Sequence, residues 1–100
     1  MPTGTRPQPN AHEIALAAII RGVMASRRPA PITQTELSRM SGIPQTTLST
    51  LLRPKTGMSV RQVMLIARAL DVNAGDLIVE AQRVAEGTDD AHTATLRLAR

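Results

Sequence analysis

Hydrophobic residues recur every three or four positions in five segments of the chain, with polar residues between them. This spacing places the hydrophobic side chains on one face of an α-helix. The sequence therefore predicts an all-α fold, a compact five-helix bundle over residues 10–87. The predicted core positions of the five helices, in chain order, are Leu16, Ile19, Ile20 and Val23; Leu37 and Met40; Leu48, Leu51 and Leu52; Val63, Met64, Ile66, Ala67 and Leu70; and Leu77, Ile78, Ala81 and Val84.

Capping residues predict where these helices begin. A short polar residue followed three positions later by Glu or Gln can form a capping box, in which each side chain bonds the other residue's backbone N–H. The pattern occurs at Asn10 with Glu13, Thr33 with Glu36, and Ser59 with Gln62. Asn73 is expected to cap the fifth helix, where Asp76 in the first turn complements the helix dipole.

A sharp turn is predicted between the second and third helices. Gly42 supplies the positive φ that ends the second helix, and Ile43 beyond it is placed to enter the core. Pro44 suits the first turn of a helix, where no backbone donor is needed. The third helix is therefore expected over residues 44–52.

The two ends of the chain differ from the predicted bundle. Residues 1–9 contain three prolines and one glycine and are expected to form a disordered, flexible arm. Residues 88–100 form a tail that can fold as a short helix, with Asp89 and Asp90 at its start and Ala91, Ala94 and Leu98 on one side.

The composition restricts the chemistry. The chain contains no Phe, Tyr, Trp or Cys, so the core must be aliphatic and neither a disulfide nor a thiolate metal site can form. Neither of its two histidines, His12 and His92, has a Cys or a second His beside it to build a metal site or a nucleophile relay. His92 beside Asp89 and Asp90 is typical of surface chemistry rather than of a ligand set. We expect no enzymatic activity, no catalytic residue, no metal and no cofactor. Without a signal peptide or a membrane span, the predicted location is the cytoplasm or nucleoid of a bacterial host.

Positive charge is concentrated in the middle of the chain. Residues 21–70 carry eight basic side chains and one acid, a net charge of +7, whereas residues 71–100 carry a net charge of −3. A basic region is typical of a phosphate-binding surface, although it can also be an ordinary solvated face.

The outward face of the third helix is short, neutral and polar. Thr46, Ser49, Thr50 and Arg53 share this face, and Gln45 stands at its amino end. A Gln amide matches the N6 and N7 edge of adenine, and Thr can hydrogen-bond to a base or contact the thymine methyl group. The alternative is an exposed helix whose Ser and Thr are incidental, but Glu, Lys or Ala would stabilise such a helix better.

Several of these residues resemble the sequence motif of a known protein family. Thr33-Gln34-x-x-Leu37-Ser38, Gly42-Ile43, Leu48 and Leu51, Ala69-Leu70-x-Val72 and Asp76-Leu77-Ile78 are similar to the phage repressor and Cro proteins, the lambda repressor-like or XRE helix-turn-helix family. The resemblance covers residues 14–79. It implies a domain that binds double-stranded DNA with the third helix in the major groove.

The resemblance also implies roles for individual residues. The base-reading positions would be Gln45, Thr46, Ser49 and Thr50. The phosphate-contacting positions would be Gln34, Thr47, Arg53, Lys55 and Arg61.

Two functions remain open from the sequence. The first is a transcriptional repressor, either a phage immunity repressor or a Cro-like protein. It would bind a palindromic operator as a homodimer and could be a monomer in solution. The second is an antitoxin-type protein that binds a partner protein through residues 74–100 and regulates its own gene through the helix-turn-helix.

Overall fold

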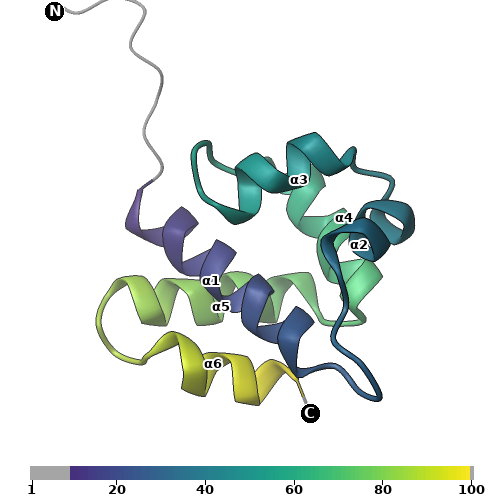
Figure 1. Cartoon of the computed structure of the whole chain (residues 1–100). Coiled ribbons are helices and arrows are strands. Elements are labelled where there is room, and N and C mark those ends of the chain that lie inside the picture. The colour runs from purple at the N-terminus through teal and green to yellow at the C-terminus, as the bar shows by residue number, and fades with distance from the viewer. Residues whose placement is uncertain (1–9, 100) are drawn as a thin grey trace, which may run out of the picture.

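The computed structural model describes residues 10–99, which form six helices (Figure 1). No strand occurs among these residues. The arm expected at residues 1–9 lies outside the described part of the chain. The helices are α1 (Ala11–Ser26), α2 (Gln34–Ser41), α3 (Gln45–Leu52), α4 (Val60–Leu70), α5 (Ala74–Ala85) and α6 (Ala91–Leu98).

Helix α1 is the central element of the fold. It packs mainly on α5 and α6 and also contacts α3, while α2 packs on α3 and α4. Most predicted core positions are buried in one aliphatic cluster. The side chains with less than 2% exposure include Ile19, Ile20, Val23, Leu37, Leu48, Ile66, Leu70 and Leu77.

Three predicted core residues are instead exposed. Met40, Met64 and Ile78 expose 42%, 58% and 47% of their surface, so their assignment to the core was wrong. Met64 and Ile78 directly follow the buried Val63 and Leu77, and consecutive helical residues point about 100° apart. Helices α2, α4 and α5 therefore bury a narrower stripe than their hydrophobic residues suggested.

The predicted starts of α1, α2, α4 and α5 are confirmed. All three capping boxes form, and the Asn73 side chain accepts a hydrogen bond from the Asp76 backbone N–H. Pro44 differs from the expectation, because it is the N-cap of α3 instead of its first helical residue. Its ψ of 143° is extended, so the helix begins at Gln45.

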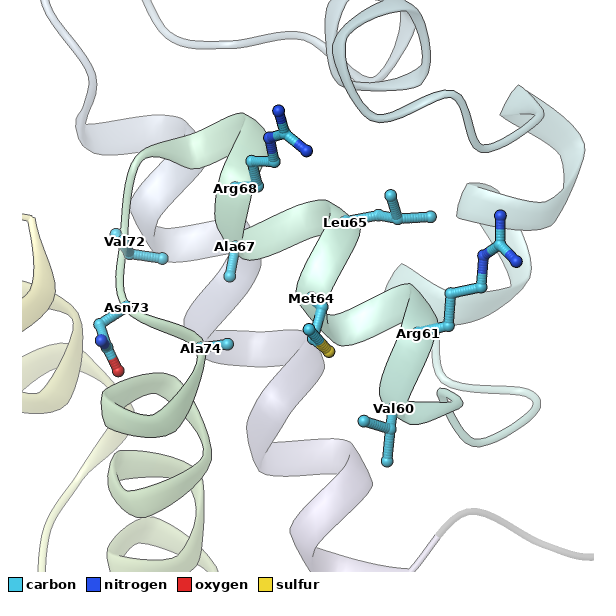
Figure 2. A pocket seen from close by; sticks show the side chains of 9 residues that line it. All are labelled: Val60, Arg61, Met64, Leu65, Ala67, Arg68, Val72, Asn73 and Ala74. Atoms are coloured by element: carbon cyan, nitrogen blue, oxygen red, sulfur yellow. The ribbon is translucent and has the colours of Figure 1, made fainter.

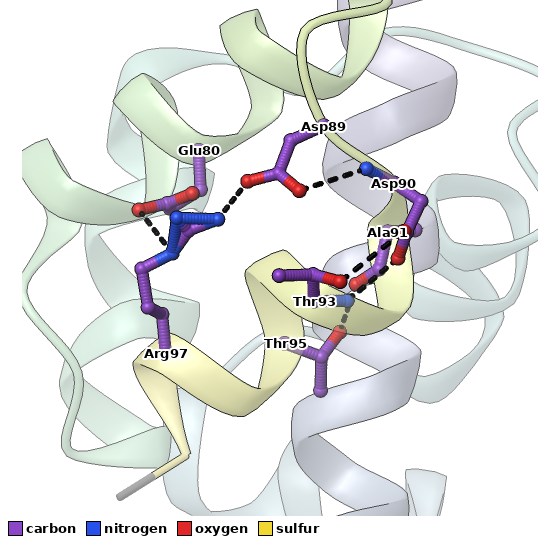
Figure 3. A network of polar contacts seen from close by, with 7 residues as sticks. All are labelled: Glu80, Asp89, Asp90, Ala91, Thr93, Thr95 and Arg97. Carbon is purple, nitrogen blue, oxygen red and sulfur yellow. Dashed lines mark hydrogen bonds and ion pairs between the residues drawn. The ribbon is translucent and has the colours of Figure 1, made fainter.

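The last helix is an integral part of the bundle. Ala94 and Thr95 of α6 are buried against α1, where a Cβ at Gly22 would lie only 2.5 Å from Thr95 Oγ1. Arg97 of α6 lies between Glu80 of α5 and Asp89 of the preceding turn and pairs with both carboxylates (Figure 3). The residues read as a tail thus cover α1 and α5.

Candidate nucleic-acid interface

Polar contacts hold the turn that joins α2 to α3. Gly42 has a φ of 78°, and its N–H donates to the Ser38 carbonyl at 2.9 Å. The Ser38 hydroxyl donates to the Ile43 carbonyl at 2.6 Å, and the Ile43 N–H donates to the Ser41 hydroxyl at 3.2 Å. Because Ile43 is also buried, the turn is fixed by both hydrogen bonds and packing.

The two faces of α3 differ as the sequence predicted. Leu48, Leu51 and Leu52 are buried in the core. On the other side, Gln45 and Thr46 are exposed, whereas Thr47, Ser49 and Thr50 are half-buried. The structure therefore presents the amino-terminal half of α3 more openly than its second half. None of its eight residues is charged.

Two of these polar side chains already have hydrogen-bond partners. Gln45 Nε2 donates to Thr35 Oγ1 at 3.1 Å, which joins the first turns of α3 and α2 at the surface. The Thr50 hydroxyl donates to the Thr47 carbonyl at 2.8 Å within α3. Thr35 was absent from the sequence-based site. The helical spacing of residues could not indicate Thr35, because its contact with Gln45 crosses the turn between α2 and α3.

The residues predicted to contact phosphate come from α2, α3, the loop after α3 and α4. Gln34 begins α2, Arg53 is the C-cap of α3, Lys55 lies in the following loop and Arg61 is in the first turn of α4. Arg53, Lys55 and Arg61 are exposed. In residues 10–99 the only ion pairs are those of Arg97, so these three cations are not neutralised by a carboxylate there.

These predicted phosphate ligands do not form one cluster. Gln34 and Arg53 line the same hollow of about 290 Å³ between α1, α2 and α3, together with Arg21. Arg61 instead borders a different groove, on α4 and the start of α5. The structure thus places Arg53 and Arg61 beside two separate hollows.

The groove on α4 and α5 is largely apolar and has a volume of about 620 Å³. Val60 and Met64, which line it, are 71% and 58% exposed. Figure 2 shows these side chains on α4, with Val72, Asn73 and Ala74 across the groove at the start of α5. Arg61 and Arg68 border it, so the groove combines an apolar surface with positive edges.

Two arginines of the α1 end were not singled out in the sequence. Arg21 donates from Nη1 to the carbonyl of Leu52, the last residue of α3. Arg27 donates from Nη2 to the carbonyl of Leu70, the last residue of α4. Both bonds place a cation at a helix carboxyl terminus, where it is favoured by the helix dipole.

Residues 10–99 contain no group of three His, Cys, Asp or Glu side chains arranged to hold a metal ion. His12 and His92 are both exposed. Within the same range, every helix is too short or too polar to cross a membrane.

Comparison with known proteins identifies the family to which these helices correspond. The family model described as a Cro/C1-type HTH DNA-binding domain matches residues 20–80, a range that includes α2, the Gly42 turn and α3. No curated protein and no solved structure matches the chain.

Proposed function

Because the chain belongs to the Cro/C1-type helix-turn-helix DNA-binding family, we propose that this transcription regulator is a repressor that reads its operator in the major groove through α3. The proposal is carried by the surface of α3. Its open end presents an amide and a hydroxyl, Gln45 and Thr46, with no charged side chain on the helix. Short neutral side chains allow a helix to approach base edges closely.

Within this proposal, base contacts and phosphate contacts come from different residues. Gln45, Thr46, Ser49 and Thr50 read bases. Gln34, Thr47, Arg53, Lys55 and Arg61 contact phosphates and orient the domain, which adds affinity without sequence preference. The hydrogen bond from Gln45 to Thr35 supports the first role, because it holds the amide at the surface in one orientation.

Replacing Gln45 tests the base-reading role. The preferred site is first selected from random duplex DNA, and the affinities of the wild type and Gln45→Ala are then measured on that site and its single-base variants. We expect a loss of about 1–3 kcal/mol and relaxed preference at one base pair. The matched control is Gln82→Ala, an exposed amide on α5. If Gln45→Ala discriminates between the bases as well as the wild type does, the assigned role is wrong.

We also propose that two copies bind a palindromic operator and contact each other through the α4–α5 groove. The support is the exposed apolar surface of Val60 and Met64. Stable interfaces bury about 1,200–2,000 Å² in total, so a contact centred on one shallow groove favours a dimer that assembles on DNA.

Met64→Gln tests the dimer contact. This change removes apolar surface without adding charge, so binding to an isolated half-site should be unchanged while cooperative binding to the full site falls. Ile14→Gln, at an exposed apolar position on α1, is the control. Unchanged cooperativity in Met64→Gln, or a selected site with a single half, would exclude a dimer through this groove.

A further inference from the structure

The hollow between α1, α2 and α3 joins two predicted phosphate ligands to an arginine with no assigned role. Arg21 comes from the last two turns of α1, Gln34 from the start of α2 and Arg53 from the end of α3. All three line the same space of about 290 Å³, and Leu52 also lines it. The hollow therefore brings together residues from three separate helices.

Arg21 acts on the end of α3 through a hydrogen bond. The last carbonyls of a helix have no partner within that helix, and the guanidinium of Arg21 satisfies the carbonyl of Leu52. The next residue, Arg53, is non-helical, with a ψ of 78°, and its N–H reaches the Ser49 carbonyl at 3.2 Å. Because α3 has only eight residues, a contact at its final carbonyl restrains the position of Arg53.

Gln34 is held relative to the same end of α1. The loop before α2 is attached by a hydrogen bond of 2.9 Å from the Ile32 N–H to the Met24 carbonyl, three residues beyond Arg21. The segments that carry Gln34 and Arg53 are thus both hydrogen-bonded to the last two turns of α1. Their separation is then fixed before DNA binds, which lowers the ordering cost of binding.

We propose that Arg21 is a positioning residue for DNA binding. By holding the Leu52 carbonyl, it keeps Arg53 at a fixed distance from Gln34, so that both side chains reach the sugar-phosphate backbone together. The inference rests on the proposed function, because it requires that these two residues contact DNA.

The chain provides two matched controls. Arg27→Ala also removes one positive charge and one hydrogen bond to a helix-terminal carbonyl, but that carbonyl belongs to Leu70 at the end of α4. Arg28→Ala removes one positive charge from an exposed position in the loop after α1. The first control reports the cost to the fold, and the second reports the loss of net charge.

The experiment is a double-mutant cycle on duplex affinity with Arg21→Ala, Arg53→Ala and the combined variant, each checked for folding by thermal denaturation. We expect Arg21→Ala to weaken binding about tenfold, the effect of one charge-assisted contact, and more than either control. In the Arg53→Ala background the further loss should be less than about threefold, because Arg21 acts through Arg53. Arg21→Lys, which retains a cationic donor, should restore part of the affinity.

Amide hydrogen exchange provides a readout independent of DNA. The N–H groups of Arg53 and Lys55 bond the Ser49 and Thr50 carbonyls, and their exchange should accelerate in Arg21→Ala but not in Arg27→Ala. Unchanged exchange, or additive losses in the cycle, overturns the positioning role; additive losses with a reduced salt dependence indicate direct phosphate contact by Arg21 instead. A wild-type chain that binds no duplex overturns the proposed function and this inference together, whereas wild-type binding that survives Arg21→Ala overturns this inference alone.

Discussion

Gly22 allows α1 and α6 to approach closely, and Gly22→Ala tests whether α6 is seated as described. A Cβ at this position would lie 2.5 Å from Thr95 Oγ1 and 2.8 Å from Thr95 Cγ2. Thr95 is 6% exposed, and its hydroxyl donates to the Ala91 carbonyl at 2.7 Å. Because Thr is branched at Cβ and has few helical rotamers, the side chain cannot turn away from the new methyl group.

Two opposing effects determine the size of the change. Replacing Gly by Ala inside a helix stabilises it by about 1 kcal/mol, through backbone entropy and propensity. Inserting a methyl group into a packed contact typically costs about 1–3 kcal/mol. At contact distances of 2.5 and 2.8 Å the clash should dominate, giving a net loss of about 1 kcal/mol and a Tm lower by about 4–8 °C for a domain of this size.

Chemical and thermal denaturation of four proteins would measure this effect: the wild type, Gly22→Ala, Thr95→Ala and the double variant. Thr95→Ala removes both atoms that clash and leaves its own Cβ 3.2 Å from the new one. Gly22→Ala should therefore be neutral or stabilising in the Thr95→Ala background, with a coupling energy of at least about 1 kcal/mol. If Gly22→Ala is as stable as the wild type when Thr95 is present, α6 does not pack on α1 in this way.

Two further predictions concern charge. Arg53→Ala should weaken binding to all duplexes alike and reduce the slope of log affinity against log salt by about 1, whereas Arg83→Ala on α5 should leave the slope unchanged. Asp90 accepts hydrogen bonds from the Thr93 backbone N–H and hydroxyl, which lower the Asp90 pKa below its ordinary value of 3.8. Its cap therefore stabilises α6 fully above about pH 4 and is lost as the pH falls through the lowered pKa. Denaturation at a series of acidic pH values should show this loss in the wild type and less of it in Asp90→Asn, which keeps a capping oxygen; equal pH dependence would contradict the assignment.

The helix boundaries could be predicted because their causes are local. Each capping box involves residues three positions apart, as at Asn10, Thr33 and Ser59, and its chemistry is independent of the rest of the fold. The same holds for Gly42, whose positive φ is a property of one residue and its neighbours. The sequence therefore predicted the start of α2 and the turn that places α3.

The extent of the buried faces could not be predicted in the same way. Hydrophobic periodicity gives the direction of a helix face, but neighbouring helices determine how wide a stripe is covered. Met64 follows the buried Val63 on α4, yet it borders an open groove because no helix within residues 10–99 covers that side. Met40 is exposed on α2, whose buried residues are Leu37 and Ser41.

The candidate site combines features that depend on local sequence with features that depend on neighbouring helices. The polar face of α3 follows from the spacing of its residues and was predicted. The contacts that orient this face were not, because they join residues far apart in the sequence: Gln45 with Thr35, and Arg21 with the Leu52 carbonyl 31 residues away. The spacing of residues within a helix does not indicate which distant residues form such pairs. Arg21 contributed only to the count of positive charges.

The acidic last third of the chain gains a structural explanation. The sequence reading offered residues 74–100 as a surface for a protein partner, in keeping with an antitoxin. In the structure, Glu80 and Asp89 pair with Arg97, and Asp90 caps α6. Three of the six acids in residues 71–100 thus stabilise α6 or its contact with α5.

This arrangement changes how partner binding must be tested. Removing residues 88–100 would remove α6, which packs on α1 and α5 and buries Ala94 and Thr95, together with the cation that pairs with Glu80. A truncated chain would lose stability whether or not α6 binds a partner. The informative variants are neutral replacements of exposed acids such as Asp76 and Glu86, which carry negative charge without pairing to Arg97. Loss of a partner in those variants, with the fold intact, would support the antitoxin function over a repressor that acts on DNA alone.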